Sequence, residues 1–488
     1  MAAEVNLPLL PDRGASHIVA WRDGRAVSQA ELLADVLALS GVLSRVLPST
    51  AATSGVAPAA INLCLDRYWF AVAFLACAHR GVVNLLPSSN APMHLAQLVA
   101  HNPGVIALGD QPEALMAGCP WLDAAQAVAS ERASMMAQGR DVAPDATHAD
   151  LHETPAMPTV PADRVVARFH TSGSTGEPQA CDKRFGLLFA GHQAAASAVL
   201  ALTGGPCPVV GTSSFRHMFG FEATVMLPLW AGGALTGGTP FFPADVASDL
   251  AAQPSPALLV TTPYHLRKML EADIAFPPCA GMLSATAPLS PDLAKAAEAR
   301  LRAPLLEVYG ATELGMLATR RTSESSAWTL LPGFSLASSE AGFMARGPSL
   351  AQPQALHDLV EPDDTAEGGR RFRLIDRSSN LINVVGKRSS LGFLNEVLQS
   401  LPGVQDGVFC VPPDVAHHDV TRLAAFVVAP GLTPADVLAG LRPHVDPVFL
   451  PRPIVMLDAL PRDANAKLPV AALRALQAEH LQRKGGTT

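Results

Sequence analysis

This chain is poor in lysine and in aromatic side chains. Among its 488 residues there are six lysines, and Phe, Trp and Tyr together make up 5%. Acidic residues outnumber basic ones by 43 to 35, which gives a formal charge of −8. A duplex-binding protein usually presents a basic face, and a single-strand binder stacks bases on aromatic rings. The composition therefore argues against a nucleic-acid partner, and it makes each lysine a candidate for a specific role.

Cysteine patterns and long apolar runs are also missing. The seven cysteines are scattered and form no Cys-x-x-Cys pair, so no zinc site or disulfide framework is predicted. The most apolar window is Tyr68–Ala78, and its eleven residues are too few for a bilayer span, which needs about 20. Residues Met1–Leu10 have neither a basic region nor a long apolar stretch. We therefore expect a cytoplasmic protein without a membrane span.

Hydrophobic residues make up 49% of the chain, which is enough for a large core. In the first 130 residues, Ser28–Leu47 and Tyr68–His79 have helical periodicity, whereas Ala60–Leu65 and Gly81–Leu86 are typical of buried strands. A strand, a helix and a second strand in succession favour parallel pairing. The predicted fold class is therefore α/β.

The same alternation continues after a break. Residues 137–163 are rich in Pro, Asp, Thr and His and are interpreted as a surface linker. A helix is expected at 292–301, and strands at 165–170, 208–211, 258–261, 282–284 and 305–309. From about Arg371 a third region begins, in which 371–375 and 381–385 are expected to be antiparallel strands before a β/α/β/α finish.

The first motif that suggests a chemical function directly follows a predicted strand. It is rich in glycine and hydroxyl side chains, whose backbone N–H groups can form an anion nest for nucleotide phosphates. It lacks the lysine of a Walker A loop and is not GxGxxG. Taken alone, it fits an ordinary Ser/Gly turn equally well. Its residues are Thr171, Ser172, Gly173, Ser174, Thr175, Gly176, Glu177 and Pro178.

The second motif lies where the strand at 305–309 ends. An aromatic ring, a hydroxyl and a carboxylate converge there, and a carboxylate beside a nucleotide is a natural Mg²⁺ ligand. The alternative is a strand-end turn with a helix-capping threonine. The residues are Glu307, Val308, Tyr309, Gly310, Ala311, Thr312 and Glu313.

The third motif, Leu460–Leu468, contains one of the rare lysines, Lys467, on a loop of small residues. A lysine ammonium is a compact charge that can stabilise developing negative charge. On its own, a solvated lysine is the default interpretation.

In this order and at these separations, the three motifs together resemble those of the AMP-forming adenylating enzymes. This superfamily contains acyl- and aryl-CoA ligases, peptide-synthetase adenylation domains and luciferases. The resemblance extends over essentially the whole chain. It implies a large N-terminal domain at 1–376 with parallel-rich sheets, and a small mobile α+β lid at 377–488 that turns about Ser379.

The resemblance also implies roles for individual residues. ATP would bind at the phosphate loop Thr171–Gly176, and Glu313 would hold Mg²⁺. Thr312 and His217 would join Lys467 in catalysis. The adenine and ribose would contact Thr286, Ala287, Pro288, Tyr309, Gly310, Ala311, Asp358 and Arg377. The acid would contact His217, Met218, Ser284, Glu307 and Gly310.

Several positions depart from the family pattern. The phosphate loop usually ends in lysine, whereas this chain has Gln179, and we hypothesise that Lys183 supplies the charge instead. Asp376 stands where a glycine is usual before Arg377, and Ala466 stands where a glycine precedes the terminal lysine.

Family membership would imply two half-reactions. A carboxylate attacks the α-phosphate of ATP to give an acyl-adenylate and pyrophosphate, and a phosphopantetheine thiol then displaces AMP. Bulky Met218 and Phe219 after His217 suggest a short, flat pocket for an aromatic acid. The chain most resembles the ligases of aryl polyene and xanthomonadin pigments, which implies 3-hydroxybenzoate as acid and an acyl carrier protein as acceptor.

Two alternatives remain open at this stage. Coenzyme A carries the same thiol arm, so the protein could be an aryl-CoA or short acyl-CoA ligase. The departures at Gln179 and Ala466 also permit a non-catalytic adenylate-binding protein. Retention of four family residues together argues against that second alternative, namely Lys467, Glu313, Asp358 and Arg377.

Overall fold

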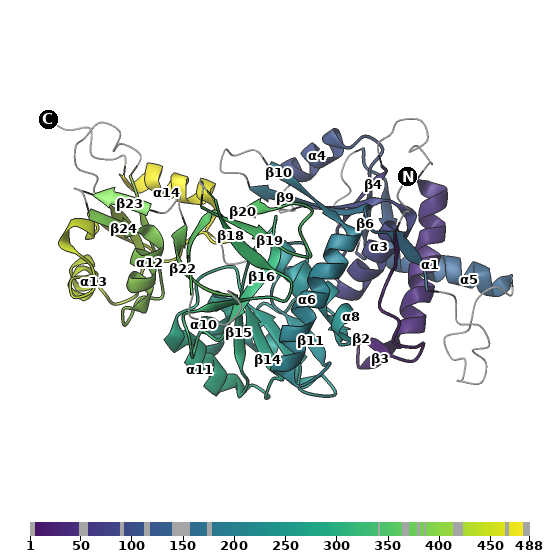
Figure 1. Cartoon of the computed structure of the whole chain (residues 1–488), viewed down its shortest axis with the longest axis horizontal. Coiled ribbons are helices and arrows are strands. Elements are labelled where there is room, and N and C mark those ends of the chain that lie inside the picture. The colour runs from purple at the N-terminus through teal and green to yellow at the C-terminus, as the bar shows by residue number, and fades with distance from the viewer. Residues whose placement is uncertain are drawn as a thin grey trace.

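The structure, a computed structural model, describes most of the chain in three successive regions (Figure 1). The described residues are 5–47, 57–87, 92–111, 118–138, 157–172, 178–339, 342–363, 370–377, 381–384, 387–412, 423–463 and 468–481. Parallel sheets flanked by helices form the larger part, and the last region lies at one end. This confirms the predicted α/β class.

The first sheet has the strand order β10-β9-β5-β4-β6-β7. Strands β4 and β5 are parallel, as the β-α-β pattern predicts, and α3 connects them. Ser28 caps α1 through a reciprocal capping box with Glu31, which explains why that helix begins where the sequence predicts. The strands are β4 Ala59–Asn62, β5 Val83–Leu86, β6 Ile106–Gly109, β7 Trp121–Asp123, β9 Val165–Ser172 and β10 Pro178–Arg184; the helices are α1 Gln29–Val46, α3 Arg67–Arg80, α4 Pro92–His101 and α5 Ala124–Ala137.

The second sheet has the order β21-β22-β17-β16-β15-β14-β13-β11-β12-β2-β3. Its centre, β11 to β15, is parallel, and the strands predicted at 208–211 and 258–261 have those bounds. The strands are β2 Ile18–Arg22, β3 Arg25–Ser28, β11 Pro208–Gly211, β12 Ala234–Thr236, β13 Leu258–Thr261, β14 Gly281–Ser284, β15 Leu305–Ala311, β16 Gly315–Arg320, β17 Trp328–Leu330, β21 Asp358–Pro362 and β22 Arg371–Arg377.

Helices cover this sheet and connect its strands. Between β11 and β12 the chain makes one run, in which α7 passes into a π-helical turn and then into α8. The helices are α6 Phe185–Thr203, α7 Met218–Phe221, η1 Glu222–Met226, α8 Leu227–Ala231, α9 Pro243–Ala251, α10 Pro263–Glu271 and α11 Pro291–Leu301.

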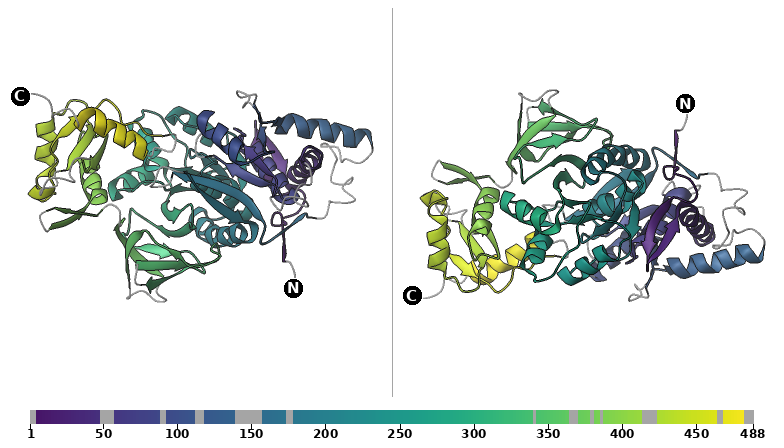
Figure 2. Two further views of the ribbon diagram at one scale, coloured as in Figure 1. Left: turned by 90° about the horizontal axis from the view of Figure 1, so that it is seen from above. Right: turned by 90° about the horizontal axis from the view of Figure 1, so that it is seen from below.

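The last region lies at the end of the molecule away from α1 and α5 in all three views (Figures 1 and 2). Arg267 of α10 donates to Gln399 of α12 at 3.0 Å, which ties this region to the second sheet's helices. A separate small sheet, β18-β19-β20, precedes it. The elements are β18 Ser335–Ser339, β19 Gly342–Arg346, β20 Gln354–Ala355, β23 Leu381–Val384, β24 Lys387–Ser390, α12 Leu391–Ser400, β25 Asp406–Cys410, β26 Ala424–Val428, α13 Pro434–Leu441, η4 Pro447–Phe449, β27 Ile454–Met456 and α14 Val470–Leu481.

Two predictions about local structure were wrong. The expected linker 137–163 ends in a strand, β8 Thr159–Pro161, because that segment pairs with β1 Asn6–Pro8 at the start of the chain. Segments 371–375 and 381–385 do not pair with each other, because β22 joins β17 and β21 whereas β23 pairs with β24. The pairing of β1 with β8 is long-range, so local sequence patterns could not indicate it. Strands β22 and β23 take partners on opposite sides of the expected boundary at residue 377, so similar strand patterns on either side did not mean that they pair.

The longest apolar helix is α6, rather than the segment Tyr68–Ala78. Among the described residues, α6 is the one helix long and apolar enough to cross a membrane by length and composition. It packs against α8, β10 and β16 and carries buried His192. Contacts of this kind are typical of a core helix.

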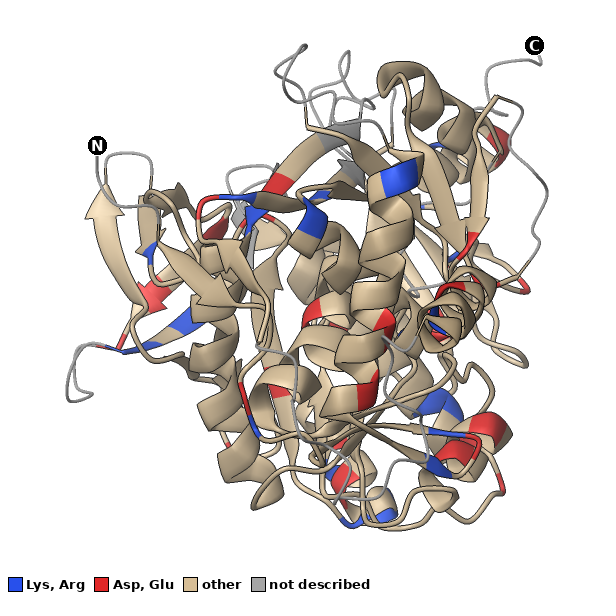
Figure 3. Cartoon of the chain, turned by 90° about the vertical axis from the view of Figure 1, so that its right-hand side faces the viewer, with Lys and Arg blue, Asp and Glu red and all other residues tan. Residues whose placement is uncertain are grey.

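Lysine, arginine and acidic positions are interspersed in the view of Figure 3. Neither sign forms a continuous face in that view, in keeping with the slightly negative net charge. A nucleic-acid footprint would instead gather cations on one face.

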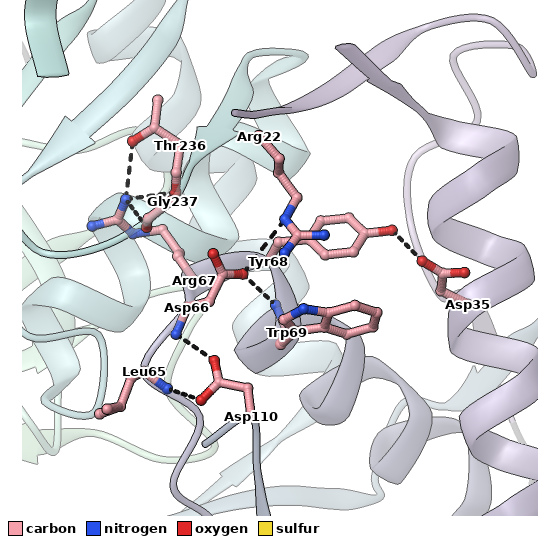
Figure 4. A network of polar contacts seen from close by, with 10 residues as sticks. All are labelled: Arg22, Asp35, Leu65, Asp66, Arg67, Tyr68, Trp69, Asp110, Thr236 and Gly237. Atoms are coloured by element: carbon pink, nitrogen blue, oxygen red, sulfur yellow. Dashed lines mark hydrogen bonds and ion pairs between the residues drawn. The ribbon is translucent and has the colours of Figure 1, made fainter. Parts of the chain in front are cut away.

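Arg67, the first residue of α3, connects the two sheets. Its side chain is fully buried, and burial lowers the pKa of the guanidinium to about 10. Figure 4 shows it directed at Thr236 and Gly237 in and after β12. The guanidinium donates to five neutral oxygens at 2.9–3.2 Å, namely Thr224 Oγ1, Thr236 Oγ1 and the carbonyls of Thr236, Gly237 and Gly211.

We expect Arg67→Met to destabilise the protein strongly. The substitution keeps an apolar stem but leaves these buried acceptors without a donor, and breaking such a network costs about 3–5 kcal/mol. Urea unfolding should show a clearly lower midpoint for this variant. Arg80→Met, at the exposed end of the same helix, is the matched control and should change stability by less than about 0.5 kcal/mol. An equal, small effect of both substitutions would contradict the role given to Arg67.

Candidate active site

A cavity of about 140 Å³ lies where the parallel strands of the second sheet end. Ser213 follows β11 and Ala285 follows β14, while Val308 and Gly310 lie in the second half of β15. Ligands of open α/β sheets bind outside the carboxyl ends of the strands, so this is the expected place for a site. The lining residues are Phe169, His170, Ser213, Arg216, His217, Met218, Phe219, Gly220, Glu222, Ala285, Thr286, Val308, Gly310, Ala311, Thr312, Gly315 and Met316.

The run from α7 to α8 forms one wall of this cavity. His217 is the N-cap residue of α7, and both it and Met218 line the cavity. A Cβ at Gly220 would lie 2.0 Å from the carbonyl oxygen of Ser214, so only glycine permits this close approach. The π-helical turn that follows places Glu222 in the same wall. Such π-helical turns occur frequently at functional sites.

The strand β15 divides its residues between two faces. Val308 and Gly310 face the cavity, so Glu307 points to the opposite side. There its carboxylate accepts hydrogen bonds from Arg320 at 2.7 Å and Thr322 at 2.6 Å. Burial raises the pKa of Glu307, and these partners oppose that shift. Glu307, predicted to contact the acid, thus lies outside the cavity lining, because the period of two along a strand turns its side chain to the other face.

Tyr309 and Asp358, both predicted to contact the nucleotide, are brought together across 49 residues of chain. The Tyr309 hydroxyl donates to the Asp358 carboxylate at 2.6 Å. In the antiparallel pairing of β21 with β22, Asp358 lies opposite Arg377. Tyr309 and Asp358 are thus in direct contact, and the backbone of Arg377 lies beside that of Asp358.

The segment after β14 contains a strained residue. Thr286 has φ +79°, a left-handed conformation that non-glycine residues rarely adopt. It lines the cavity, and its hydroxyl is buried without a hydrogen-bond partner among the described residues. Strain of this kind is concentrated at ligand sites. Ser284, predicted to contact the acid, is fully buried outside the lining, and Ala287 and Pro288 are exposed outside it.

Strand β10 supports the backbone of the Tyr-Gly-Ala-Thr-Glu motif. Lys183 is buried and its ammonium donates to the carbonyl oxygen of Glu313 at 3.3 Å, while the Cys181 thiol donates to that of Thr312 at 3.7 Å. The hypothesis that Lys183 also supplies charge to the phosphate loop stays a prediction. Its visible contact holds the backbone at Glu313.

Several predicted site residues lie outside the described residues. These are Gly173, Ser174, Thr175, Gly176, Ser379 and Lys467. Thr171 and Ser172 end β9, and their partners Gln179 and Pro178 begin β10, so the phosphate loop connects two paired strands. The lysine motif begins at a fixed point, because Arg462 makes a bidentate ion pair with Asp406 of β25 at 2.6 Å.

Glu222, with its neighbour His192, was missed by the sequence analysis. Burial raises the pKa of Glu222 to about 7 and lowers that of His192 to about 4, and the charge of Lys183 opposes the first shift and reinforces the second. A signal was available, because Glu222 is the only Asp, Glu, Lys or Arg between Arg216 and Asp245. A carboxylate inside an apolar run is costly unless it has a partner or a task.

Comparison with known proteins agrees with this geometry. Residues 12–341 match the sequence model of a family described as AMP-binding enzyme, which is more than half of the chain. The chain belongs to the AMP-binding enzyme family.

Named relatives of this AMP-binding enzyme include two ligases. A 4-coumarate–CoA ligase of Rhodobacter capsulatus is 33% identical over 282 residues, which is 57% of this chain and 67% of the relative. A 4-chlorobenzoate–CoA ligase of Arthrobacter is 24% identical over 381 residues, 68% of this chain and 70% of the relative. Among solved structures, the o-succinylbenzoate coenzyme A synthetase MenE from Bacillus subtilis, in complex with ATP and magnesium, matches with a TM-score of 0.75 and 17% identity over 95% of this chain and 98% of that one. That likeness confirms the fold.

Glu313 of this AMP-binding enzyme is suitably placed to coordinate a magnesium ion that is bound together with ATP. Glu313 is exposed at the end of β15, with its backbone held by Lys183. Mg²⁺ is usually bound by one or two carboxylates together with substrate phosphates, rather than by a protein cage. In the part of the chain that the structure describes, no group of three or more His, Cys, Asp or Glu forms such a cage.

We expect Tyr309→Phe to weaken ATP binding. Without the hydroxyl, the Asp358 carboxylate, to which the family resemblance assigns the ribose, loses a charge-assisted hydrogen bond and its fixed position. The KM for ATP should rise about three- to tenfold with kcat little changed. The matched control is Tyr264→Phe, on α10 outside the cavity lining, which should leave the KM for ATP unaltered. Equal KM values for both variants would show that Tyr309 does not organise the ribose site.

Proposed function

We propose that this AMP-binding enzyme is an AMP-forming ligase that activates a small aromatic carboxylic acid, with 3-hydroxybenzoate favoured. The observation that carries the proposal is the size and place of the cavity. An apolar cavity of about 150 Å³ accepts benzene. The cavity of this chain measures about 140 Å³, a volume on the scale of one aromatic ring.

The polar groups around the cavity suit the two reacting partners. Ring atoms would contact Met218, Phe219 and Val308, and the carboxylate would lie toward Gly310 and His217. The nucleotide would extend toward Tyr309 and Asp358, which are joined by a hydrogen bond of 2.6 Å and would bind the ribose. The relatives named for coumarate and chlorobenzoate are aryl-acid ligases, which supports an aromatic substrate.

In the first half-reaction, a carboxylate oxygen of the acid forms a bond to the α-phosphorus of ATP. The bond from that phosphorus to the bridging oxygen breaks, and pyrophosphate leaves. Lys467 would stabilise the charge on the transferring group, as electrostatic stabilisation is the main contribution to phosphoryl transfer. Thr171–Gly176 would hold the phosphates, and Glu313 would hold the magnesium ion, which neutralises phosphate charge when bound.

In the second half-reaction, a thiol attacks the carbonyl carbon of the acyl-adenylate and AMP leaves. Rotation of residues 377–488 about Ser379 would withdraw Lys467 and admit the phosphopantetheine arm. Small mobile domains commonly complete a site in this way. We propose an acyl carrier protein as acceptor. Coenzyme A is the second candidate, and the relatives named as CoA ligases favour it.

Pyrophosphate release with ATP, Mg²⁺ and hydroxylamine tests this function. Across a panel of benzoates, cinnamates and fatty acids, we expect release with small aryl acids and none with fatty acids. Lys467→Ala should lower the rate more than about 100-fold. Lys484→Ala, the other lysine near the C-terminus, is the matched control and should keep the rate.

The outcomes separate the candidates. Addition of a phosphopantetheinylated carrier protein or of coenzyme A to the adenylating enzyme identifies the acceptor by thioester formation. Preference for fatty acids would overturn the aryl assignment. Binding of ATP without release of pyrophosphate for any acid would favour a non-catalytic adenylate-binding protein.

A further inference from the structure

Glu222 is a buried carboxylate in the cavity wall that the adenylation chemistry does not use. It is the first residue of η1, and 6% of its surface is exposed. Its carboxylate lies against the turn into β16, because a Cβ at Gly315 would be 2.8 Å from Oε1. The backbone N–H of Met316 donates a hydrogen bond to it. Gly315 and Met316 line the cavity too, so this carboxylate borders the space for the ring.

Neither His192 nor Lys183, two basic side chains near Glu222, forms a direct ion pair with its carboxylate. His192 Nε2 is 4.0 Å from Oε1, beyond hydrogen-bond distance, and it has no other partner within the described ranges. Its ring is neutral at pH 7, because burial lowers the pKa of His192 to about 4. The Lys183 ammonium attracts the carboxylate but donates to the Glu313 carbonyl.

A carboxylate has room for about four hydrogen bonds, and leaving that capacity unused in a buried place is costly. The apolar neighbours Met218, Phe219 and Val308 offer no donor. A ligand in the cavity is thus the natural source of one. We propose that Glu222 accepts a hydrogen bond from a donor on the aromatic ring, so that the enzyme selects hydroxy- or amino-substituted benzoates over unsubstituted ones. This inference rests on the proposed aryl-acid activity and names its substrate class.

The charge state of Glu222 makes this selection depend on pH. Burial raises its pKa to about 7, so the ionised fraction of Glu222 increases as the pH rises through neutrality. A phenolic hydroxyl keeps its proton over this range. Hydrogen bonds to an ionised acceptor are roughly twice as strong as neutral ones. The preference for a hydroxylated acid should therefore grow as the pH rises through 7.

Other titratable groups face the same space. His217 and His170 line the cavity, and burial lowers the pKa of His170. Lys183 and His192 approach from β10 and α6. Comparing two acids on one enzyme removes their common effects on the rate, because the measured quantity is the ratio of the two kcat/KM values.

The test measures kcat/KM for pyrophosphate release with 3-hydroxybenzoate, 4-hydroxybenzoate, 3-aminobenzoate, 3-methoxybenzoate and benzoate at pH 6, 7 and 8. We expect the unaltered enzyme to prefer the better hydroxybenzoate over benzoate by about ten- to a hundredfold at pH 8. 3-Methoxybenzoate cannot donate a hydrogen bond, so its kcat/KM should be close to that of benzoate. Comparison of 3-aminobenzoate with 3-hydroxybenzoate shows whether the enzyme prefers an amine or a hydroxyl as the donor.

Two substitutions make the assignment specific. Glu222→Leu should reduce the hydroxybenzoate-to-benzoate ratio to near one. Glu222→Gln is nearly isosteric and should keep part of the ratio but remove its dependence on pH. His265→Gln, a buried histidine of α10 outside the cavity lining, is the matched control and should preserve both.

The outcomes are distinguishable. A ratio unchanged in both Glu222 variants, or an unaltered enzyme that treats hydroxybenzoate, methoxybenzoate and benzoate alike, would overturn this inference while leaving the aryl ligase intact. Failure of the unaltered enzyme with every aryl acid would instead overturn the proposed function.

Discussion

The buried guanidinium of Arg67 is the contact on which the site depends most. It comes from the first helix after β4, in the first sheet, and its acceptors lie on β11, β12 and the π-helical turn of the second sheet. Its bond to Thr224 Oγ1 holds the turn that begins with Glu222. Because the site lies between elements of both sheets, their relative position decides the shape of the cavity. The acceptors of Arg67 are neutral, and hydrogen bonds to them require aligned donors and acceptors, so they restrict how the two sheets can lie relative to each other.

Around that contact, two buried glutamates have different roles because they have different hydrogen-bond partners. Glu307 and Glu222 are both buried, but Glu307 has Arg320 and Thr322 as partners and serves the sheet. Glu222 accepts a hydrogen bond from the backbone N–H of Met316, lies 4.0 Å from the neutral ring of His192, and borders the cavity. The same residue type thus stabilises structure in one place and is available to a ligand in the other. This difference follows from which face of an element each residue occupies.

Much of the fold was predictable because it follows from local patterns. The strands at 208–211 and 258–261 are short apolar runs between turn signals. The contact between the motif residues Tyr309 and Asp358 joins positions 49 residues apart, and the sequence pattern did not indicate it. Strand pairing between distant segments was not predictable, as β8 with β1 shows. The face of Glu307 was missed because motif membership does not specify orientation along a strand. Glu222 was missed because its chemistry depends on burial and on its neighbours from three other elements.

The central claim is that the cavity holds an aromatic ring whose substituent meets Glu222 while the nucleotide extends toward Asp358. A crystal structure with a non-hydrolysable 3-hydroxybenzoyl-adenylate analogue tests it most directly. The account predicts the ring between Met218 and Val308, with its hydroxyl within about 3 Å of the Glu222 carboxylate and the ribose hydroxyls at Asp358. A ring outside this cavity, or a hydroxyl directed away from Glu222, would contradict it.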